Sequence, residues 1–228
     1  MKRDSIIKIK PLPISVVETK KDTVIKIVNQ LKLLVPLTLY FDNDQPDSKT
    51  LKTSTNKSYN KIYETYLSLK NNYKTEYSKG LSSGKKLQAE QNIELLFTDS
   101  VMHGMQQLQK FASLLSQILP EGEQVKITLK GYCSPLASSD YNKNLARRRI
   151  SCVRNYFAEY NNGELKSYII TPTHPSEHTG NIEFTEEEIG ELKASSNVSD
   201  DLRDKKNSVY SPSAALERKI QIIAISSK

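Results

Sequence analysis

Hydrophobic and polar positions follow two different periods along the chain, and each period predicts one type of element. Short stretches that alternate, or that run through β-branched and aliphatic residues, predict strands. These stretches are 5–9, 23–28, 33–41, 124–132, 165–171 and 218–225, with a further candidate strand at 181–185. Pro36 indicates that the third of them begins after that residue or lies at a sheet edge. We expect the last of them to be a central strand.

Longer stretches repeat their apolar residues at steps of three and four, which is typical of helices with one buried face. These stretches are about 55–79, 85–118 and 140–159, and glycine or proline follows each of them. The first predicted helix carries a tyrosine-rich face from Tyr59 to Tyr77. Such a face either packs on a neighbouring element or stacks on sugars or bases, and packing is the commoner role.

The order of these elements predicts an α+β fold. We expect a two-layer sandwich of βαβαββ type, with a mixed sheet, helices packed on one face and one inserted helix. The chain divides into an N-terminal β arm, or the remnant of an upstream region, at 1–30 and one main domain at 31–228. The main domain carries insertions at about 48–84 and 172–210, the second of which is polar.

The composition is that of a folded domain. Hydrophobic residues make up 37% of the 228 and charged residues 26%. No apolar run reaches the ~18 residues that a membrane-spanning helix needs. The net charge of +7 favours an anionic partner, such as nucleic acid, acidic lipid or an anionic polymer. The first residues lack the apolar core of a signal peptide, so the protein is either cytoplasmic or numbered from after a removed segment.

Residue clusters that would indicate catalysis or a bound metal are weak in this sequence. His174 and His178 have a spacing that zinc can use on a helix, but Pro175 lies between them and no third ligand is evident. Cys152 lies about three turns into the predicted helix that Cys133 precedes, so we expect two free thiols. No nucleophile and base have a matching spacing, and no glycine-rich phosphate loop exists. We therefore expect a non-enzymatic protein without catalytic residues, metal or cofactor.

The predicted helix at 140–159 carries an arginine where its pattern calls for an apolar residue. Arg149 is four residues from both Leu145 and Val153, which belong to the inward-facing stripe. Asn142 lies seven residues earlier and points in nearly the same direction. A guanidinium in this place must be paired or must face a pocket, because an unpaired buried charge is costly.

Two interpretations of this position are open. With the free N–H groups at the start of the helix, Arg149 could bind a carboxylate or phosphate group beside the preceding strand. Alternatively, it forms a structural ion pair with a carboxylate from the Asp42–Asp47 turn or from Glu217, as many buried arginines do. The other arginines of this helix are expected to point into solvent; they are Arg147, Arg148 and Arg154.

The segment 127–157 as a whole resembles the OmpA-like C-terminal domain, which is also called the peptidoglycan-associated domain. The resemblance rests on Gly131-Tyr132, a short loop, and then Tyr141-Asn142-x-x-Leu145-x-x-x-Arg149-x-x-x-Val153. It extends more weakly to 39–44 as the first strand and to 217–220 as the start of the last. The sequence is similar to the inserted form found in Bacteroidetes envelope proteins, and this implies an OmpA-like fold.

The resemblance implies binding of peptidoglycan. In this family an aspartate and an arginine hold the side-chain carboxylate and amine of diaminopimelate in the stem peptide. The arginine matches Arg149 and a supporting asparagine matches Asn142, whereas Ser134 stands in the position of the aspartate. The missing carboxylate removes a charged hydrogen-bond partner, an effect of about 1.5–3 kcal/mol.

Three further residues are assigned to the same ligand site. Tyr132 belongs to the matching motif, and Arg218 corresponds to an arginine of the family's terminal strand. Asp140 could replace the missing carboxylate, as could Asp42 or Asp44. The implied partners are peptidoglycan and other envelope proteins. The implied location is the periplasm, in association with the outer membrane, although no signal sequence is visible.

Two other functions remain open. Because Ser134 replaces the aspartate and much chain is inserted, the OmpA-like fold could serve as a protein-interaction or structural module with lost or altered peptidoglycan binding. The run Arg147–Arg149 and the basic charge also suit nucleic acid. However, basic and aromatic residues do not interleave as they do in known readout surfaces, so we expect no nucleic-acid partner.

Overall fold

Four strands form one mixed sheet in the computed structural model, which describes residues 19–133, 139–171, 175–191, 198–199, 201 and 203–227. The strands are β1 (Leu37–Tyr40), β2 (Gln124–Cys133), β3 (Asn181–Glu191) and β4 (Lys219–Ser227). Their order across the sheet is β1-β4-β2-β3, so β4 is a central strand, as predicted. β4 runs antiparallel to both of its neighbours, and β3 runs parallel to β2.

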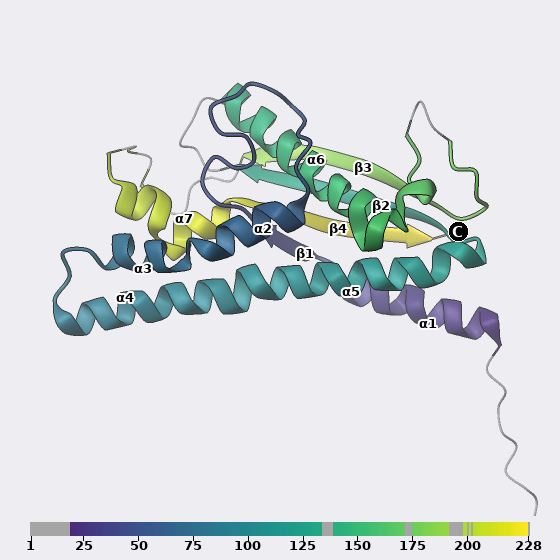
Figure 1. Ribbon diagram of the computed structural model, residues 1–228, viewed down its shortest axis with the longest axis horizontal. Coiled ribbons are helices and arrows are strands. Elements are labelled where there is room, and N and C mark those ends of the chain that lie inside the picture. Colours follow the sequence, from purple (N-terminus) through teal and green to yellow (C-terminus); the bar gives the residue numbers. More distant parts are fainter. Residues whose placement is uncertain are drawn as a thin grey trace, which may run out of the picture.

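Helices of three kinds connect the strands (Figure 1). The α-helices of the described residues are α1 (Lys20–Leu33), α2 (Tyr59–Ser68), α3 (Lys70–Ser78), α4 (Ser83–Leu95), α5 (His103–Ile118), α6 (Ser139–Gly163) and α7 (Pro212–Glu217). Two segments are π-helical, η1 (Leu96–Met102) and η4 (Lys206–Tyr210), and two are 3₁₀ helices, η2 (Leu119–Glu121) and η3 (Lys166–Tyr168).

α4, η1 and α5 follow one another without a break and form a long rod beside the sheet, which confirms the helix predicted at 85–118 (Figure 1). The rod passes very close to the edge strand β1. A Cβ atom at Gly104 would lie 2.4 Å from the main-chain oxygen of Thr38, so glycine is required at this crossing.

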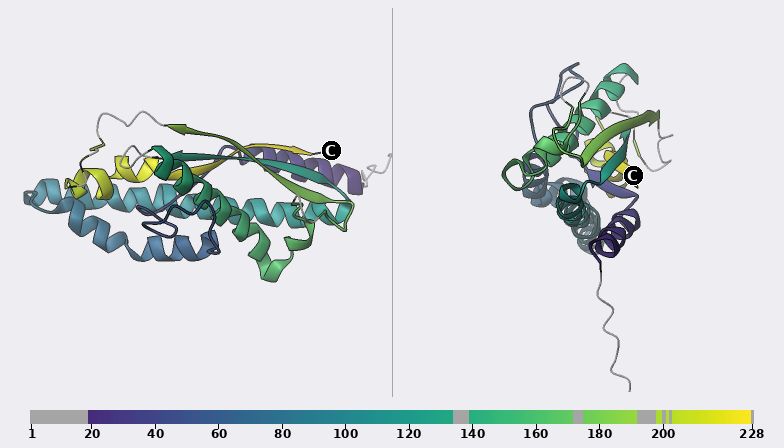
Figure 2. Two further views of the ribbon diagram at one scale, coloured as in Figure 1. Left: turned by 90° about the horizontal axis from the view of Figure 1, so that it is seen from above. Right: turned by 90° about the vertical axis from the view of Figure 1, so that its right-hand side faces the viewer.

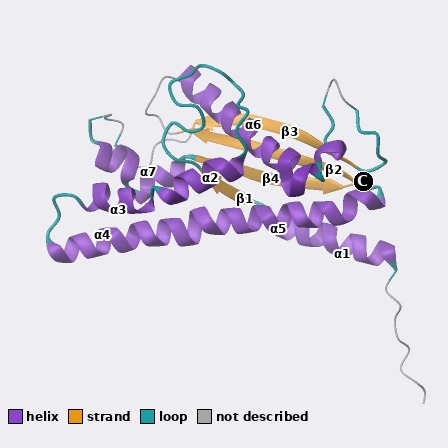
Figure 3. Ribbon diagram, viewed as in Figure 1, coloured by secondary structure: helices purple, strands orange, loops and turns teal. Residues whose placement is uncertain are grey.

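One face of the sheet is apolar and is covered by helices. Buried side chains alternate along each strand; they are Leu37 and Leu39 in β1, Val125, Ile127 and Leu129 in β2, Ile182 in β3, and Ile220 and Ile222 in β4. Figure 2 shows α2, α5 and α6 on this side, and Figure 3 shows the sheet as a separate layer behind them. Phe111 of α5 and Phe157 of α6 meet edge to face, with ring centres 6.1 Å apart. The predicted α+β class, with helices on one face of a mixed sheet, is confirmed.

The strand predicted at 23–28 is wrong, because these residues lie in α1. The helix begins at a reciprocal cap: the Asp22 N–H donates to the Thr19 hydroxyl at 3.2 Å, and the Thr19 N–H donates to the Asp22 carboxylate at 3.1 Å. Ile27 and Leu31, one turn apart, then bury the same face. The cap and this spacing outweigh the β-branched composition. Residues 1–18 of the predicted N-terminal arm lie outside the described residues.

The strand predicted at 165–171 is also wrong. The residues there form isolated bridges instead of a strand: Ile169 bridges Ile182, and η3 occupies the residues before it. The third strand of the sheet is instead β3, which includes the candidate strand at 181–185. Its Ile182 faces the apolar core, whereas Glu183 and Glu187 lie on the opposite face and pair with lysines of β2. The acidic side chains made β3 less apolar than the stretch that was predicted.

The tyrosine-rich stretch packs inside the protein. It forms two helices, α2 and α3, rather than the single helix predicted at 55–79. Tyr66 and Tyr73 are buried and meet Phe97 of η1, with ring centres between 5.1 and 5.6 Å apart. Tyr210 joins the same cluster, because its ring meets that of Tyr73 edge to face. The packing interpretation is confirmed for these side chains, and they form a second apolar cluster beside the sheet core.

Candidate functional site

The predicted ligand site lies where β2 ends and α6 begins. β1 also ends here, and residues 42–58 then form a loop beside α6 (Figure 1). A Cβ atom at Gly131 of β2 would lie 2.8 Å from the Cβ of Ala146, so glycine allows α6 to pack closely on the strand. Regular helical geometry in α6 stops before Tyr160, which agrees with the helix predicted at 140–159.

Arg149 is buried at this junction, with 1% of its surface exposed. Its Nε donates to the main-chain oxygen of Gln45 at 2.9 Å, and its Nη1 approaches the main-chain oxygen of Tyr132 at 3.5 Å. The guanidinium carbon lies 5.2 Å from the centre of the Phe41 ring, a cation–π distance. The predicted inward orientation is confirmed, and the side chain connects the loop with the ends of two strands.

Arg148 is fully buried, so the prediction that it points into solvent is wrong. Its Nε donates to the main-chain oxygen of Pro46 at 3.1 Å, and its Nη1 donates to those of Thr50 and Lys52, both at 2.8 Å. The guanidinium carbon also lies 5.5 Å from the ring centre of Tyr141. Arginine suits this place because it presents several N–H donors in a fixed plane. Arg147 is exposed, as predicted, and Arg154 is partly exposed and pairs with a glutamate of β3.

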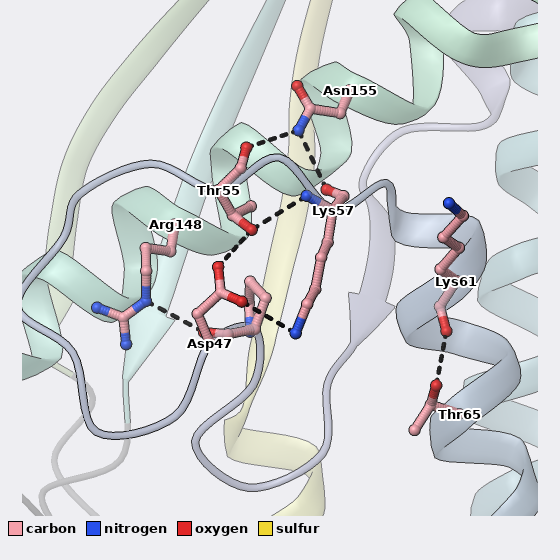
Figure 4. A network of polar contacts seen from close by, with 8 residues as sticks. Asp47, Thr55, Lys57, Lys61, Thr65, Arg148 and Asn155 are labelled. Atoms are coloured by element: carbon pink, nitrogen blue, oxygen red, sulfur yellow. Dashed lines mark hydrogen bonds and ion pairs between the residues drawn. The ribbon is translucent and has the colours of Figure 1, made fainter.

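Two more polar side chains of α6, Asn155 and Ser151, bind the same loop, and Figure 4 shows Asn155. Asn155 donates to the main-chain oxygens of Thr55 at 2.8 Å and Lys57 at 3.1 Å. The Ser151 hydroxyl donates to the Thr55 oxygen and accepts from the Thr55 N–H, each at 3.3 Å. Arg148, Ser151 and Asn155 are three and four residues apart, so they form one polar stripe on the helix. This stripe holds the loop against α6.

Asp44, one of the carboxylates considered for the ligand site, is engaged within the loop region. It accepts a hydrogen bond of 2.5 Å from the Tyr141 hydroxyl and one of 3.0 Å from the main-chain N–H of Lys49. The hydrogen bond to Asp44 and the burial of Tyr141 raise the pKa of that phenol, burial having the larger effect. Asp44 therefore joins the start of α6 to the loop.

Asp47 organises the far part of the same loop (Figure 4). It accepts from the Thr55 hydroxyl at 2.6 Å and pairs with the Lys57 ammonium at 2.9 Å. The hydrogen bond from Thr55, reinforced by Lys57 and by the charge of Arg148, holds the pKa of Asp47 below its ordinary value. A polar pocket of about 450 Å³ opens beside these groups and is lined by loop residues 47–57.

Arg218 is buried at the start of β4 and connects the ligand region to the second apolar cluster. Its Nη2 donates to the Tyr73 hydroxyl at 3.1 Å and to a main-chain oxygen of η4 at 2.9 Å. Tyr73 in turn donates to Asp42 at 2.5 Å. The Nε of Arg218 approaches the main-chain oxygen of Phe41 at 3.4 Å, and Arg149 lies over the ring of the same residue. Phe41 therefore contacts both guanidinium groups, one through its main-chain oxygen and the other through its ring.

The other predicted ligand residues lie around the same junction. Tyr132 is half-buried in β2, and Asn142 is half-buried in the first turns of α6. Asp140 is exposed at the start of that helix. Ser134 lies outside the described residues. The described contacts thus bring Tyr132 directly to Arg149.

Sequence reasoning missed the role of Arg148, Ser151 and Asn155. Their acceptors are main-chain oxygens about a hundred residues earlier, and hydrophobic periodicity carries no information on such contacts. The signal that could have been used is the polar stripe itself, because it lies next to the apolar stripe of α6 and recurs at helical spacing.

Within the described ranges, no three His, Cys, Asp or Glu side chains come together in a way that could hold a metal ion. His174 and the side chain of Cys133 lie outside those ranges. Cys152 is a buried free thiol, as predicted, and its burial raises the pKa of the thiol far above the ordinary value. None of the described helices combines the length and the apolar composition that crossing a membrane requires.

The fold and the site define a two-layer α+β domain whose strand–loop–helix junction contains buried arginines. Comparisons with family models, with curated proteins and with solved structures found no match to this chain.

Proposed function

We propose that this chain is a non-enzymatic envelope domain of OmpA-like type. In this proposal it binds peptidoglycan through a diaminopimelate-containing stem peptide and anchors an outer-membrane or periplasmic assembly. The element order supports it, because β1, the rod, β2, α6, β3 and β4 follow the βαβαββ sequence that the resemblance implies.

The position of Arg149 carries the proposal. Its Nε donates to the main-chain oxygen of Gln45 and its guanidinium carbon lies over the Phe41 ring, so the guanidinium is fixed before any ligand arrives. Its Nη1 is directed toward the end of β2, and the loop that binds ligand in this family follows that strand. A planar fork fixed in this way suits a carboxylate, which it can bind with two hydrogen bonds.

The second charge of diaminopimelate requires a partner other than Ser134. Asp44 is engaged by Tyr141 and Lys49, whereas Asp140 is exposed in the first turn of α6. We assign Asp140 to the ligand ammonium, because a carboxylate there is accessible.

The test is sedimentation with peptidoglycan sacculi, followed by titration with a diaminopimelate muropeptide. The wild-type protein is expected to sediment with sacculi. Arg149→Lys keeps the charge but loses the planar fork, so it is expected to bind the muropeptide about tenfold more weakly, or about 1.4 kcal/mol. Ser134→Asp restores the family's charge pair and is expected to bind more tightly.

Arg154→Ala is the matched control, because Arg154 lies on the same helix in a partly exposed ion pair with Glu186. It is expected to bind like wild type. The proposal fails if wild-type protein stays in the supernatant, or if Arg149→Lys and Arg154→Ala bind equally well.

A second candidate function is a protein-interaction module on the same fold. It is favoured by α3 and α4, which extend beyond the end of the sheet (Figure 1). Leu87 and Leu95 of α4 are more than half exposed, and exposed apolar side chains are typical of docking surfaces. This function predicts that the protein does not bind the muropeptide, and that cross-linkers placed on α4 capture a defined envelope partner that Leu87→Lys no longer captures.

A further inference from the structure

The face of the sheet opposite the helices carries a row of side chains that the peptide-binding proposal does not use. The Lys219 ammonium of β4 lies 5.2 Å from the centre of the Tyr132 ring in β2. The Lys130 ammonium lies 5.8 Å from the same ring. Tyr132 is thus an aromatic ring, half-buried, with two lysines beside it.

Polar groups continue this face along the strands. The Gln221 amide donates to the Thr38 hydroxyl at 2.9 Å, and the hydroxyls of Thr128 and Thr185 lie 3.1 Å apart. These side chains alternate with the buried apolar residues of the same strands, so they all point away from the helices. The face therefore offers amide and hydroxyl groups next to one aromatic ring.

The charge on this face is largely compensated. Lys130 pairs with Glu187 at 2.8 Å, and Lys126 pairs with Glu183 at 3.7 Å. Among the described carboxylates, none lies within ion-pair distance of Lys219. The face thus carries one lysine that lacks a carboxylate partner within the part of the chain that the structure describes.

This pattern distinguishes two kinds of polymer. Binding of nucleic acid depends on many lysines and arginines that neutralise phosphates, and here two of the three lysines are already paired. A polysaccharide requires an aromatic face for the C–H groups of its sugar rings, with amide and hydroxyl groups beside it. An unpaired ammonium would add a donor for a sugar carbonyl or carboxylate oxygen.

We propose that this face of the sheet binds the glycan strand of peptidoglycan, an N-acetylated amino-sugar polymer, with Tyr132 as the stacking ring and Lys219 as the cation. The inference rests on the proposed function and extends it. Tyr132 connects the two sites, because its main-chain oxygen lies 3.5 Å from Nη1 of Arg149 while its ring lies beside the lysines. One strand of polymer could then present its peptide to Arg149 and its sugars to Tyr132.

The test is titration of the full chain with peptide-free glycan strands, prepared by removing the stem peptides enzymatically. Wild-type protein is expected to bind them. Tyr132→Ala is expected to bind about tenfold more weakly, which corresponds to about 1.4 kcal/mol, and Lys219→Gln is expected to be weakened to a smaller extent. Tyr132→Phe keeps the ring and is expected to bind like wild type, which separates loss of stacking from loss of folding.

Lys126→Gln is the matched control, because Lys126 lies on the same face at the far end of β2 and is paired with Glu183. It is expected to leave glycan binding unchanged. The inference is overturned if wild type does not bind peptide-free glycan, or if Tyr132→Ala binds it as well as wild type does. Salt-sensitive binding of single-stranded RNA or DNA that is lost in Tyr132→Ala, without glycan binding, would overturn it in favour of nucleic acid.

The two proposals fail separately. If the muropeptide binds and requires Arg149 but peptide-free glycan does not bind, the proposed function stands and the glycan surface is disproved. If peptide-free glycan binds and requires the Tyr132 ring but the muropeptide binds no better than glycan alone, the surface stands and the diaminopimelate site is disproved.

Discussion

Arg148 and Arg149 are neighbours in α6 and both are buried, yet they are held in different ways. Arg148 donates to three main-chain oxygens of one loop, all within 3.1 Å. Arg149 donates to the main-chain oxygen of Gln45 in that loop at 2.9 Å, and its Nη1 lies 3.5 Å from the main-chain oxygen of Tyr132 in β2. Burial therefore does not distinguish an arginine that closes a loop from one that we propose binds a ligand. The hydrogen-bond acceptors distinguish the two arginines. Those of Arg148 all lie in the loop after β1, whereas those of Arg149 lie both in that loop and in β2.

The loop that Arg148 closes needs such a contact because its backbone is irregular. Asp44, Asp47 and Lys49 have φ values of 55°, 53° and 58°, in the left-handed region that L-residues rarely adopt. Aspartate tolerates this region better than most residues, but lysine does not. Main-chain oxygens in such a loop have few partners of their own, and the polar stripe of α6 supplies donors for them.

The largest effect is expected from Arg148→Ala. Three main-chain oxygens lose a charged donor, and we expect the free energy of unfolding to fall by about 3 kcal/mol or more. Urea unfolding followed by circular dichroism measures this. Arg148→Lys is expected to recover only part of the loss, because an ammonium cannot reproduce the planar arrangement of donors. A loss below about 1 kcal/mol would show that the loop does not depend on this side chain.

Arg149→Ala is expected to have a smaller effect on stability and a larger one on binding. Its Nε donates to the main-chain oxygen of Gln45, and the loss of that contact should lower the free energy of unfolding by about 1–2 kcal/mol in the same assay. Sedimentation with sacculi should be lost in Arg149→Ala and retained in Arg148→Ala at a temperature where both are folded. If both variants lose the same stability and neither changes binding, the difference between the two arginines disappears.

Asn155→Ala removes two hydrogen bonds to the loop and is expected to lower the free energy of unfolding by about 1 kcal/mol. The thiol of Cys152 reports the accompanying opening, because it is buried on the same helix and Asp47 and Lys57 of the loop act on it electrostatically. The reaction is measured in protein that carries Cys133→Ser, so that Cys152 is its one thiol. Without a further substitution, this protein should react slowly with iodoacetamide at pH 8, since burial raises the pKa of Cys152. Asn155→Ala should react several times faster, and Arg154→Ala at the wild-type rate. Equal rates in all three would show that the stripe does not hold the loop closed.

The contrast between the arginines also shows which features the sequence could predict. The period of α6 predicted the inward orientation of Arg149, and the alternation at 124–132 predicted β2, because both depend on neighbours in the chain. α1 was missed although Thr19 and Asp22 form a recognisable cap, since the β-branched run after them was given more weight. Arg148 could not be placed, because its burial depends on a loop about a hundred residues away that adopts no regular structure.

β3 shows the same limit at the level of the sheet. The stretch 165–171 is more apolar than 181–191, and composition alone favours it as the strand. A local steric feature identifies the place where β3 starts: a Cβ atom at Gly180 would lie 2.1 Å from the main-chain oxygen of Leu119, so the chain enters the sheet through a close approach that only glycine permits. The sequence shows the glycine, but it does not show that Leu119 is the residue that this glycine approaches.

The smallest expected effect concerns Asp47, which holds the loop without contacting either guanidinium directly. Its pKa is lowered in the folded protein by the Thr55 hydroxyl first, then by Lys57 and the charge of Arg148. A lowered folded pKa means that the stabilisation is fully present above the unfolded value of about 4 and is lost as the pH falls through the folded value.

Asp47→Asn should therefore lower the free energy of unfolding by less than about 1 kcal/mol at pH 7, since the pair with Lys57 is partly exposed. The difference from wild type should shrink below about pH 4, and urea unfolding at pH 7 and pH 3 measures both values. A difference that stays constant between these pH values would show that Asp47 acts through its shape rather than its charge. In that case Arg148 would close the loop without electrostatic help from this carboxylate.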